Sequence, residues 1–186
     1  MTETNTFSRA LHDVGLAAWF GGSLMGAIGL NGGAATANVA SERPRIASSG
    51  WSKWTPINAA AIGAHLLGSV AQIGANKGRI TGQKGVASAS IIKTALTGAA
   101  LGATAYARVV GKKIEEQSPA PTEGVTEPSA ATPPDLAAAQ RREKILQWAI
   151  PALTGSLVAF SAFMGEQQRP ASVLSGTTRR AKSLLS

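Results

Sequence analysis

The chain has 186 residues, of which 44% are hydrophobic and only 15% charged, and its formal net charge is +8. It contains no cysteine, which excludes disulfides and thiolate metal sites. Basic residues are not interleaved with aromatic ones as on a nucleic-acid-binding module, so we expect no nucleic-acid partner. The charges are crowded into a few stretches, and long charge-free windows lie between them.

The first expected element is a membrane-spanning helix at about residues 12–31. It lies in a stretch without charged side chains that extends from Val14 to Ser41, and a helix needs about 20 residues to cross the hydrocarbon core of a bilayer. The same stretch loosely fits a secretory signal peptide. Because Asp13 borders the apolar run and Arg9 is the sole basic side chain before it, we expect this helix to be retained.

A second spanning helix is expected at about residues 55–76, because no charged residue occurs between Trp54 and Asn76. Trp51 and Trp54 precede this helix, at the headgroup level that amphipathic aromatic rings favour. We expect Pro56 in its first turn, where the backbone nitrogen needs no hydrogen-bond partner.

The third spanning helix is expected at about residues 88–110, with Lys93 near its start so that the ammonium group reaches the membrane surface. After this helix the composition changes. Residues 115–135 contain five prolines among Thr, Ser and Glu, with few large apolar side chains. We expect these residues to form an extended, mobile loop.

The fourth helix is expected at about residues 136–165, with Asp135 as its N-cap. At 1.5 Å per residue this helix is longer than the bilayer is thick, so its first three turns, Leu136–Lys144, should project as a polar stem. We expect a matching stem at the end of the third helix. Exposed charges should hold it only weakly to the stem of the fourth helix. Residues 167–186 are expected to form a polar, basic tail.

Together these elements predict an all-α fold: one integral membrane domain, residues 1–186, built as a four-helix bundle with a long Pro-rich loop between helices three and four. A soluble Ala-rich helical bundle is the alternative. We expect the protein in the plasma membrane, surrounded by lipid. Both termini are expected in the cytoplasm, because the short loop Lys77–Lys84 carries only basic charge.

Two glycine pairs predict close helix packing. Gly22 and Gly26, and likewise Gly98 and Gly102, have the spacing of small residues that lets two membrane helices approach closely. In lipid, dispersion between such backbones replaces the hydrophobic drive. The abundance of Gly and Ala in all four windows therefore favours association of these helices with one another or with a partner.

Polar residues within the spans mark candidate sites. Asn58, His65 and Gln72 are spaced seven apart, so they share one helix face. They predict hydrogen bonds between helices, with a haem or metal ligand at His65 or a conducting path along this face as alternatives. In the pair His12-Asp13 the carboxylate either fixes the histidine tautomer or simply lies at the interface. We expect His12 and His65 about 15 Å apart along the membrane normal, too far to share a ligand.

The sequence contains no HExxH motif, no phosphate-binding loop and no nucleophile–base–acid set. We therefore expect neither enzyme activity nor a soluble small-molecule substrate. No cofactor is expected unless the histidines hold haem or copper.

The segment 11–22, LHDVGLAAWFGG, resembles the opening helix of the copper-resistance D-like four-helix membrane families, in which a histidine precedes a tryptophan and paired glycines. That resemblance implies copper handling. In size and layout the chain resembles uncharacterised actinobacterial membrane proteins and the accessory subunit of the cytochrome bcc–aa3 respiratory supercomplex. The leading hypothesis is a non-catalytic accessory or assembly subunit of a larger membrane complex, expected to be that supercomplex, with other membrane subunits as partners. The alternative is a metal- or haem-handling protein that uses His12 and His65.

Overall fold

A computed structural model describes residues 4–78, 85–117 and 120–166, and within these ranges the chain consists of helices and their connections. The first rod is built of three consecutive pieces: α1 (Thr4–Met25), the π-helical segment η1 (Gly26–Leu30) and α2 (Asn31–Ala35). The other rods are α3 (Glu42–Ala75), α5 (Val86–Glu116) and α6 (Pro134–Glu166). The predicted all-α, four-helix architecture is confirmed, and all four rods are long and apolar enough to cross a membrane.

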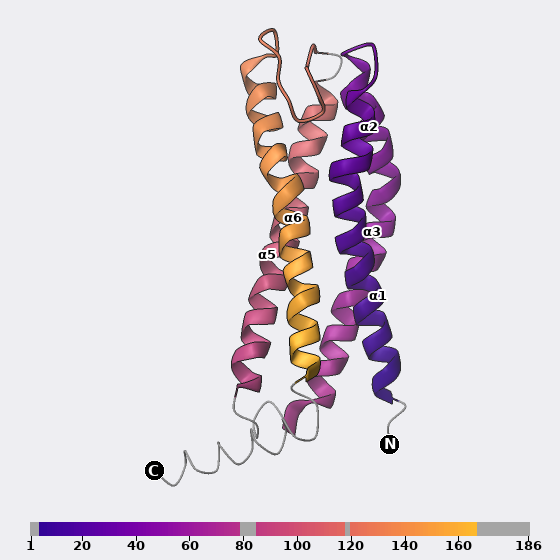
Figure 1. Cartoon of the computed structure of the whole chain (residues 1–186), viewed down its shortest axis with the longest axis vertical. Helices are drawn as coiled ribbons and strands as arrows, with labels where there is room; N and C mark the ends of the chain where they lie inside the picture. Colours follow the sequence, from indigo (N-terminus) through magenta and orange to yellow (C-terminus); the bar gives the residue numbers. More distant parts are fainter. Residues whose placement is uncertain (1–3, 79–84, 118–119, 167–186) are drawn as a thin grey trace.

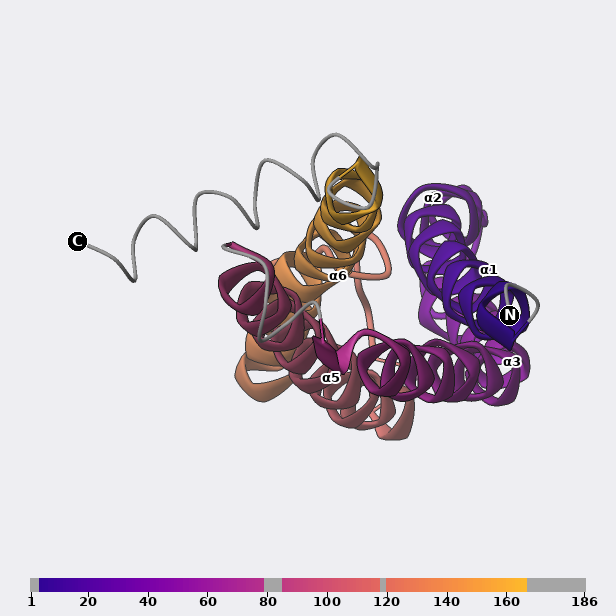
Figure 2. The ribbon, with the colours of Figure 1, turned by 90° about the horizontal axis from the view of Figure 1, so that it is seen from below.

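The rods run side by side along the long axis of the molecule (Figure 1). α1 packs most extensively on α3, and α5 on α6, so the bundle consists of two helix pairs (Figure 2). A buried cluster of Leu16 and Trp19 from α1 with Ala100 and Leu157 joins the pairs. The indole nitrogen of Trp19 also donates a hydrogen bond to Thr104 Oγ1 of α5, at 3.1 Å. By contrast, α3 and α5 touch each other little.

Glycine allows α1 and α3 to approach until their backbones touch. A Cβ atom added at Gly15 would lie 2.4 Å from the carbonyl oxygen of Ala61, and one added at Gly68 would lie 2.5 Å from the backbone nitrogen of His12. Farther along the same interface, Gly22 lies against the indole ring of Trp54, and Gly26 lies against that of Trp51. Helices this close gain dispersion along their whole contact.

The second rod begins earlier than predicted. α3 starts at Glu42, directly after a short turn, rather than near residue 55. Pro56 consequently lies inside the helix instead of in its first turn. Charged residues in the added turns misled the prediction, because a window free of charge measures the apolar part of a helix and not its length. The expected basic tail, 167–186, and most of the loop Lys77–Lys84 lie outside the described residues.

The Pro-rich connection between α5 and α6 is folded onto the bundle, so the expectation of an extended loop is wrong for residues 120–133. Gln140 Nε2 donates to the carbonyl oxygens of Gly124 and Val125, at 3.2 and 3.0 Å. Val125 is buried against Ala34 and Ala47. Figure 1 shows this segment turning back along the end of the bundle. Backbone groups that receive such partners can be withdrawn from water at little cost, which composition alone does not reveal.

Two details of the predicted stems also need correction. The stems of α5 and α6 are held together by buried apolar side chains, Val110 and Ile114 against Leu136 and Ala139, rather than by exposed charges alone. Asp135 lies in the first turn of α6, one residue after the helix begins, and is not its N-cap. Its carboxylate still faces the positive end of the helix dipole.

One asparagine ties three parts of the chain together at the loop end. Asn31 Oδ1 accepts a hydrogen bond from the indole nitrogen of Trp51, and Asn31 Nδ2 donates to Gln147 Oε1, both at 2.9 Å. Gln147 Nε2 then donates to Thr126 Oγ1 in the loop. Asn31 follows η1, where its own N–H reaches the carbonyl oxygen of Gly26. The wider π-helical turn therefore sets the direction of the Asn31 side chain.

We expect Gly15→Ala and Gly68→Ala to lower the free energy of unfolding by about 1–3 kcal/mol each, because the new methyl group meets backbone atoms that cannot move aside. Thermal unfolding of the purified chain measures this loss. Gly21→Ala is the matched control on α1, because a Cβ there meets nothing within 4 Å. Equal stability of Gly15→Ala and Gly21→Ala would show that the α1–α3 contact is looser than described.

We expect Asn31→Leu to release the loop, because it leaves the Trp51 indole nitrogen and Gln147 Oε1 unpaired at a cost of about 1–3 kcal/mol. Amide hydrogen exchange of residues 120–133 should become faster than in the parent protein. The exposed Asn38, changed to Leu, serves as the control and should leave exchange unchanged. Unchanged exchange in Asn31→Leu would mean that the other contacts of the loop, among them Gln140 and the buried Val125, hold it without Asn31.

Candidate functional site

His12 and Asp13 form a hydrogen-bonded pair on α1. His12 Nδ1 lies 2.6 Å from Asp13 Oδ1, and the imidazole is 1% exposed while the carboxylate reaches the surface. With Nδ1–H donated to the carboxylate, the lone pair of a neutral imidazole is on Nε2. His12 Nε2 is buried and has no hydrogen-bond partner within the described residues.

His65 on α3 lies directly against His12. The two ring centroids are 4.4 Å apart and the ring planes are tilted by 45°, so the expected separation of about 15 Å is wrong. The short turn at residues 36–41 makes α1 and α3 antiparallel, and the glycine contacts between them fix a register that brings the two histidines to one level. The completely buried His65 directs Nδ1 at the carbonyl oxygen of His12, at 3.3 Å. Its Nε2 likewise has no partner in the described part of the chain.

The three residues of the polar face of α3 do not form a single site. Asn58, His65 and Gln72 each have one buried polar atom without a hydrogen-bond partner among the described residues. Gln72 lines the same cavity as His12, whereas Asn58 and His65 do not line it. The structure therefore joins His12, Asp13 and His65 into one cluster and separates Asn58 from it.

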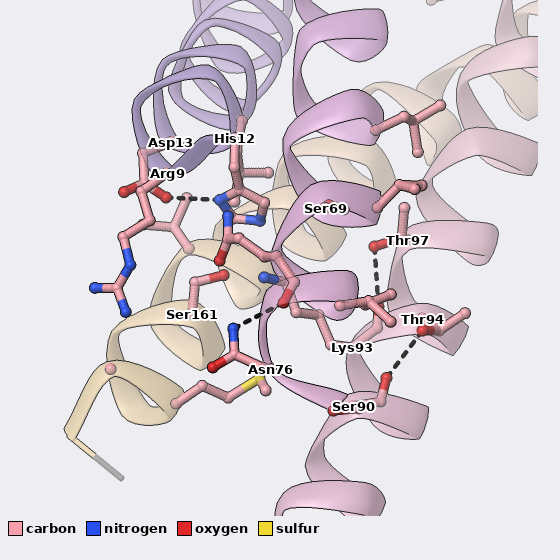
Figure 3. Close-up of a pocket in the computed structure, with 18 of the residues that line it drawn as sticks. Arg9, His12, Asp13, Ser69, Asn76, Ser90, Lys93, Thr94, Thr97 and Ser161 are labelled. Carbon is pink, nitrogen blue, oxygen red and sulfur yellow. Dashed lines mark hydrogen bonds and ion pairs between the residues drawn. The ribbon is translucent and has the colours of Figure 1, made fainter. Parts of the chain in front are cut away.

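A cavity of about 650 Å³ lies beside the histidine pair, at the end of the bundle where α1 begins. All four rods contribute to its walls, and Figure 3 shows His12, Asn76, Lys93 and Ser161 around it. Sequence reasoning assigned Lys93 to the membrane surface and did not single out Asn76 or Ser161. The sequence feature that could have indicated this cavity is Lys93, the one charged residue in an otherwise apolar window.

The capacity of this region for metal is limited to its two imidazoles. Within residues 4–78, 85–117 and 120–166 no three His, Asp or Glu side chains are placed to hold one ion. A haem between His12 and His65 does not fit. A haem iron between the two rings would need two iron–nitrogen bonds of about 2 Å, together with the distance from each nitrogen to the centre of its ring. The sum of these lengths is greater than the 4.4 Å between the ring centroids. A single ion bound at an angle to both rings remains compatible with their spacing.

A second candidate site is the outer face of α5. Six residues at alternating spacings of four and three are exposed along this face: Ile91, Ala95, Gly98, Gly102, Ala105 and Val109. We call them the α5 seam. A Cβ added at Gly98 or Gly102 would meet nothing within 4 Å, so this predicted packing pair is not used between helices of the described chain. It lies on the opposite side of α5 from the buried residues Ala89 and Ala100.

Comparison with protein-family models, with curated proteins and with solved structures finds no match to this chain, so its contacts and exposed faces are what support a functional proposal.

Proposed function

We propose that this chain is a multi-pass membrane protein that acts as a non-catalytic accessory or assembly subunit of a larger membrane complex. The observation that supports this role is the α5 seam, whose small central residues face outward. On a helix face exposed to lipid, bulky apolar side chains are solvated as well as glycine is. Glycine specifically favours the close approach of a second helix. The seam therefore has the composition of a helix contact for which the chain itself supplies no partner among its described helices.

The dimensions of the α5 seam fit a membrane partner. From Ile91 to Val109 it extends about 27 Å at 1.5 Å per residue, close to the roughly 30 Å of a bilayer core. Its alternating spacing of four and three is the repeat that keeps two helices in contact over several turns. A transmembrane helix of another subunit can thus lie along the full depth of α5.

For the complex itself we propose the cytochrome bcc–aa3 respiratory supercomplex of the plasma membrane, on the resemblance in size and four-span layout. Both termini are then cytoplasmic, which the basic composition of the loop Lys77–Lys84 favours. Within this proposal the folded loop of residues 120–133 lies on the opposite side of the membrane.

Binding of a transition-metal ion at His12 and His65 is a second candidate function, favoured by the 4.4 Å between their rings. Both Nδ1 atoms face oxygen acceptors, so both neutral rings keep the lone pair on Nε2, the atom that ligates a metal. Copper and zinc ions accept imidazole ligands readily. With two protein donors such an ion would keep open positions for exchange with a partner.

We expect the double variant Gly98→Leu, Gly102→Leu to reduce comigration of the protein with its complex by about tenfold or more, because the leucines hold the partner helix away. Native gels after mild detergent solubilisation measure comigration. Gly21→Leu, at an exposed glycine of α1, is the control and should comigrate normally. A wild-type protein that migrates as a lone monomer under these conditions would contradict the accessory role.

For the second candidate we expect the purified protein to retain about one copper or zinc ion per chain after dialysis, measured by elemental mass spectrometry. His12→Ala and His65→Ala should each abolish retention, because either change leaves one donor. Asn58→Ala, on the same face of α3 as His65, should retain the ion. Wild-type protein without metal above background would eliminate this candidate while leaving the α5 seam proposal intact.

A further inference from the structure

We propose that the cavity beside His12 binds one acidic lipid, with the phosphate or carboxylate headgroup among its polar residues and an acyl chain along its apolar wall. This inference does not rest on the α5 seam or on metal binding, although Gly98 and His12 also line the cavity. It follows from three properties of the cavity: its hydrogen-bond donors, its charge, and its opening between α3 and α5.

Three polar side chains of the cavity wall have hydrogen-bond donors to offer. Ser161 has a buried hydroxyl oxygen, and Gln72 a buried amide nitrogen, without a hydrogen-bond partner in the described part of the chain. Lys93 adds an ammonium group with three N–H donors that forms no ion pair with a described carboxylate. The charged oxygens of an anionic headgroup are acceptors, so such a headgroup in this cavity offers partners to these side chains.

The charge of the cavity also favours an anion. Arg9 and Lys93 are basic, and Asp13 is the one carboxylate along the described walls. The Asp13 carboxylate is already engaged by His12 Nδ1, at 2.6 Å. One positive charge therefore remains unneutralised, as a single phosphodiester or carboxylate headgroup requires. A zwitterionic headgroup would bring an additional ammonium group toward Arg9 and Lys93 and lose this advantage.

The rest of the wall suits a hydrocarbon chain. Leu16, Leu101 and Val158 line the cavity from three different helices. Exposed residues border it on facing sides, Val70 and Ile73 on α3 and Thr94 and Gly98 on α5. Because α3 and α5 touch little, the cavity opens sideways between them, where a membrane would lie. Its volume of about 650 Å³ is within the range of known ligand sites, about 300–1,000 Å³.

The test is native mass spectrometry of the full-length protein, released from detergent after incubation with dioleoyl phosphatidylglycerol, oleate, dioleoyl phosphatidylcholine or inorganic phosphate. We expect at least one acidic lipid to be retained about tenfold more than phosphatidylcholine, the scale set by one charge-assisted contact. Which of phosphatidylglycerol and oleate is retained identifies the headgroup. Lys93→Gln should reduce retention to the level of phosphatidylcholine.

Lys112→Gln is the matched control, since Lys112 is exposed on the same helix outside the cavity, and it should retain lipid normally. Ser161→Phe, which places a bulky ring in the cavity and leaves Lys93 in place, should also reduce retention. Thermal unfolding of each variant shows that it is folded. Equal retention of phosphatidylglycerol, oleate and phosphatidylcholine, full competition by inorganic phosphate, or unchanged retention in a folded Lys93→Gln variant would each overturn the proposal.

Discussion

The direct contact of the α1 and α3 backbones is the constraint on which the rest of the structure depends. It exists because Gly15 and Gly68 carry no side chain where the two helices cross. Once these residues are in contact, the register of the pair follows. The register places His12 against His65 and seats the indole rings of Trp51 and Trp54 over Gly26 and Gly22. A larger residue at either crossing point would separate the helices and with them the histidine cluster.

Hydrogen bonds to buried polar groups organise the two ends of the bundle differently. At the loop end, Asn31 and Gln147 satisfy each other and hold Thr126, so a Pro-rich segment becomes part of the fold. At the other end, Gln72 and Ser161 leave polar atoms without partners within the described residues. The loop end also has buried polar atoms without a described partner, on Thr122, Gln140 and Glu143. What distinguishes the other end is the cavity that Gln72 and Ser161 line.

Helix α5 connects the proposed roles. Its inner side carries Lys93 toward the cavity, its outer side carries the α5 seam, and Gly98 borders both. A partner helix on the seam would lie beside the opening between α3 and α5 and cover part of it.

The sequence alone determined the all-α class, the four apolar rods and their order, because charge-free windows of helical length can be read from composition. It also indicated the residues of interest, His12, His65 and the glycine pairs, because polar or small residues in such windows are conspicuous. Only the tertiary structure decided which of these residues meet. The glycine contact at Gly15 and Gly68, the 4.4 Å spacing of the histidines and the folded loop each depend on the register between helices. Register is determined by packing of residues far apart in the chain, and the periodicity within one helix contains no information about it.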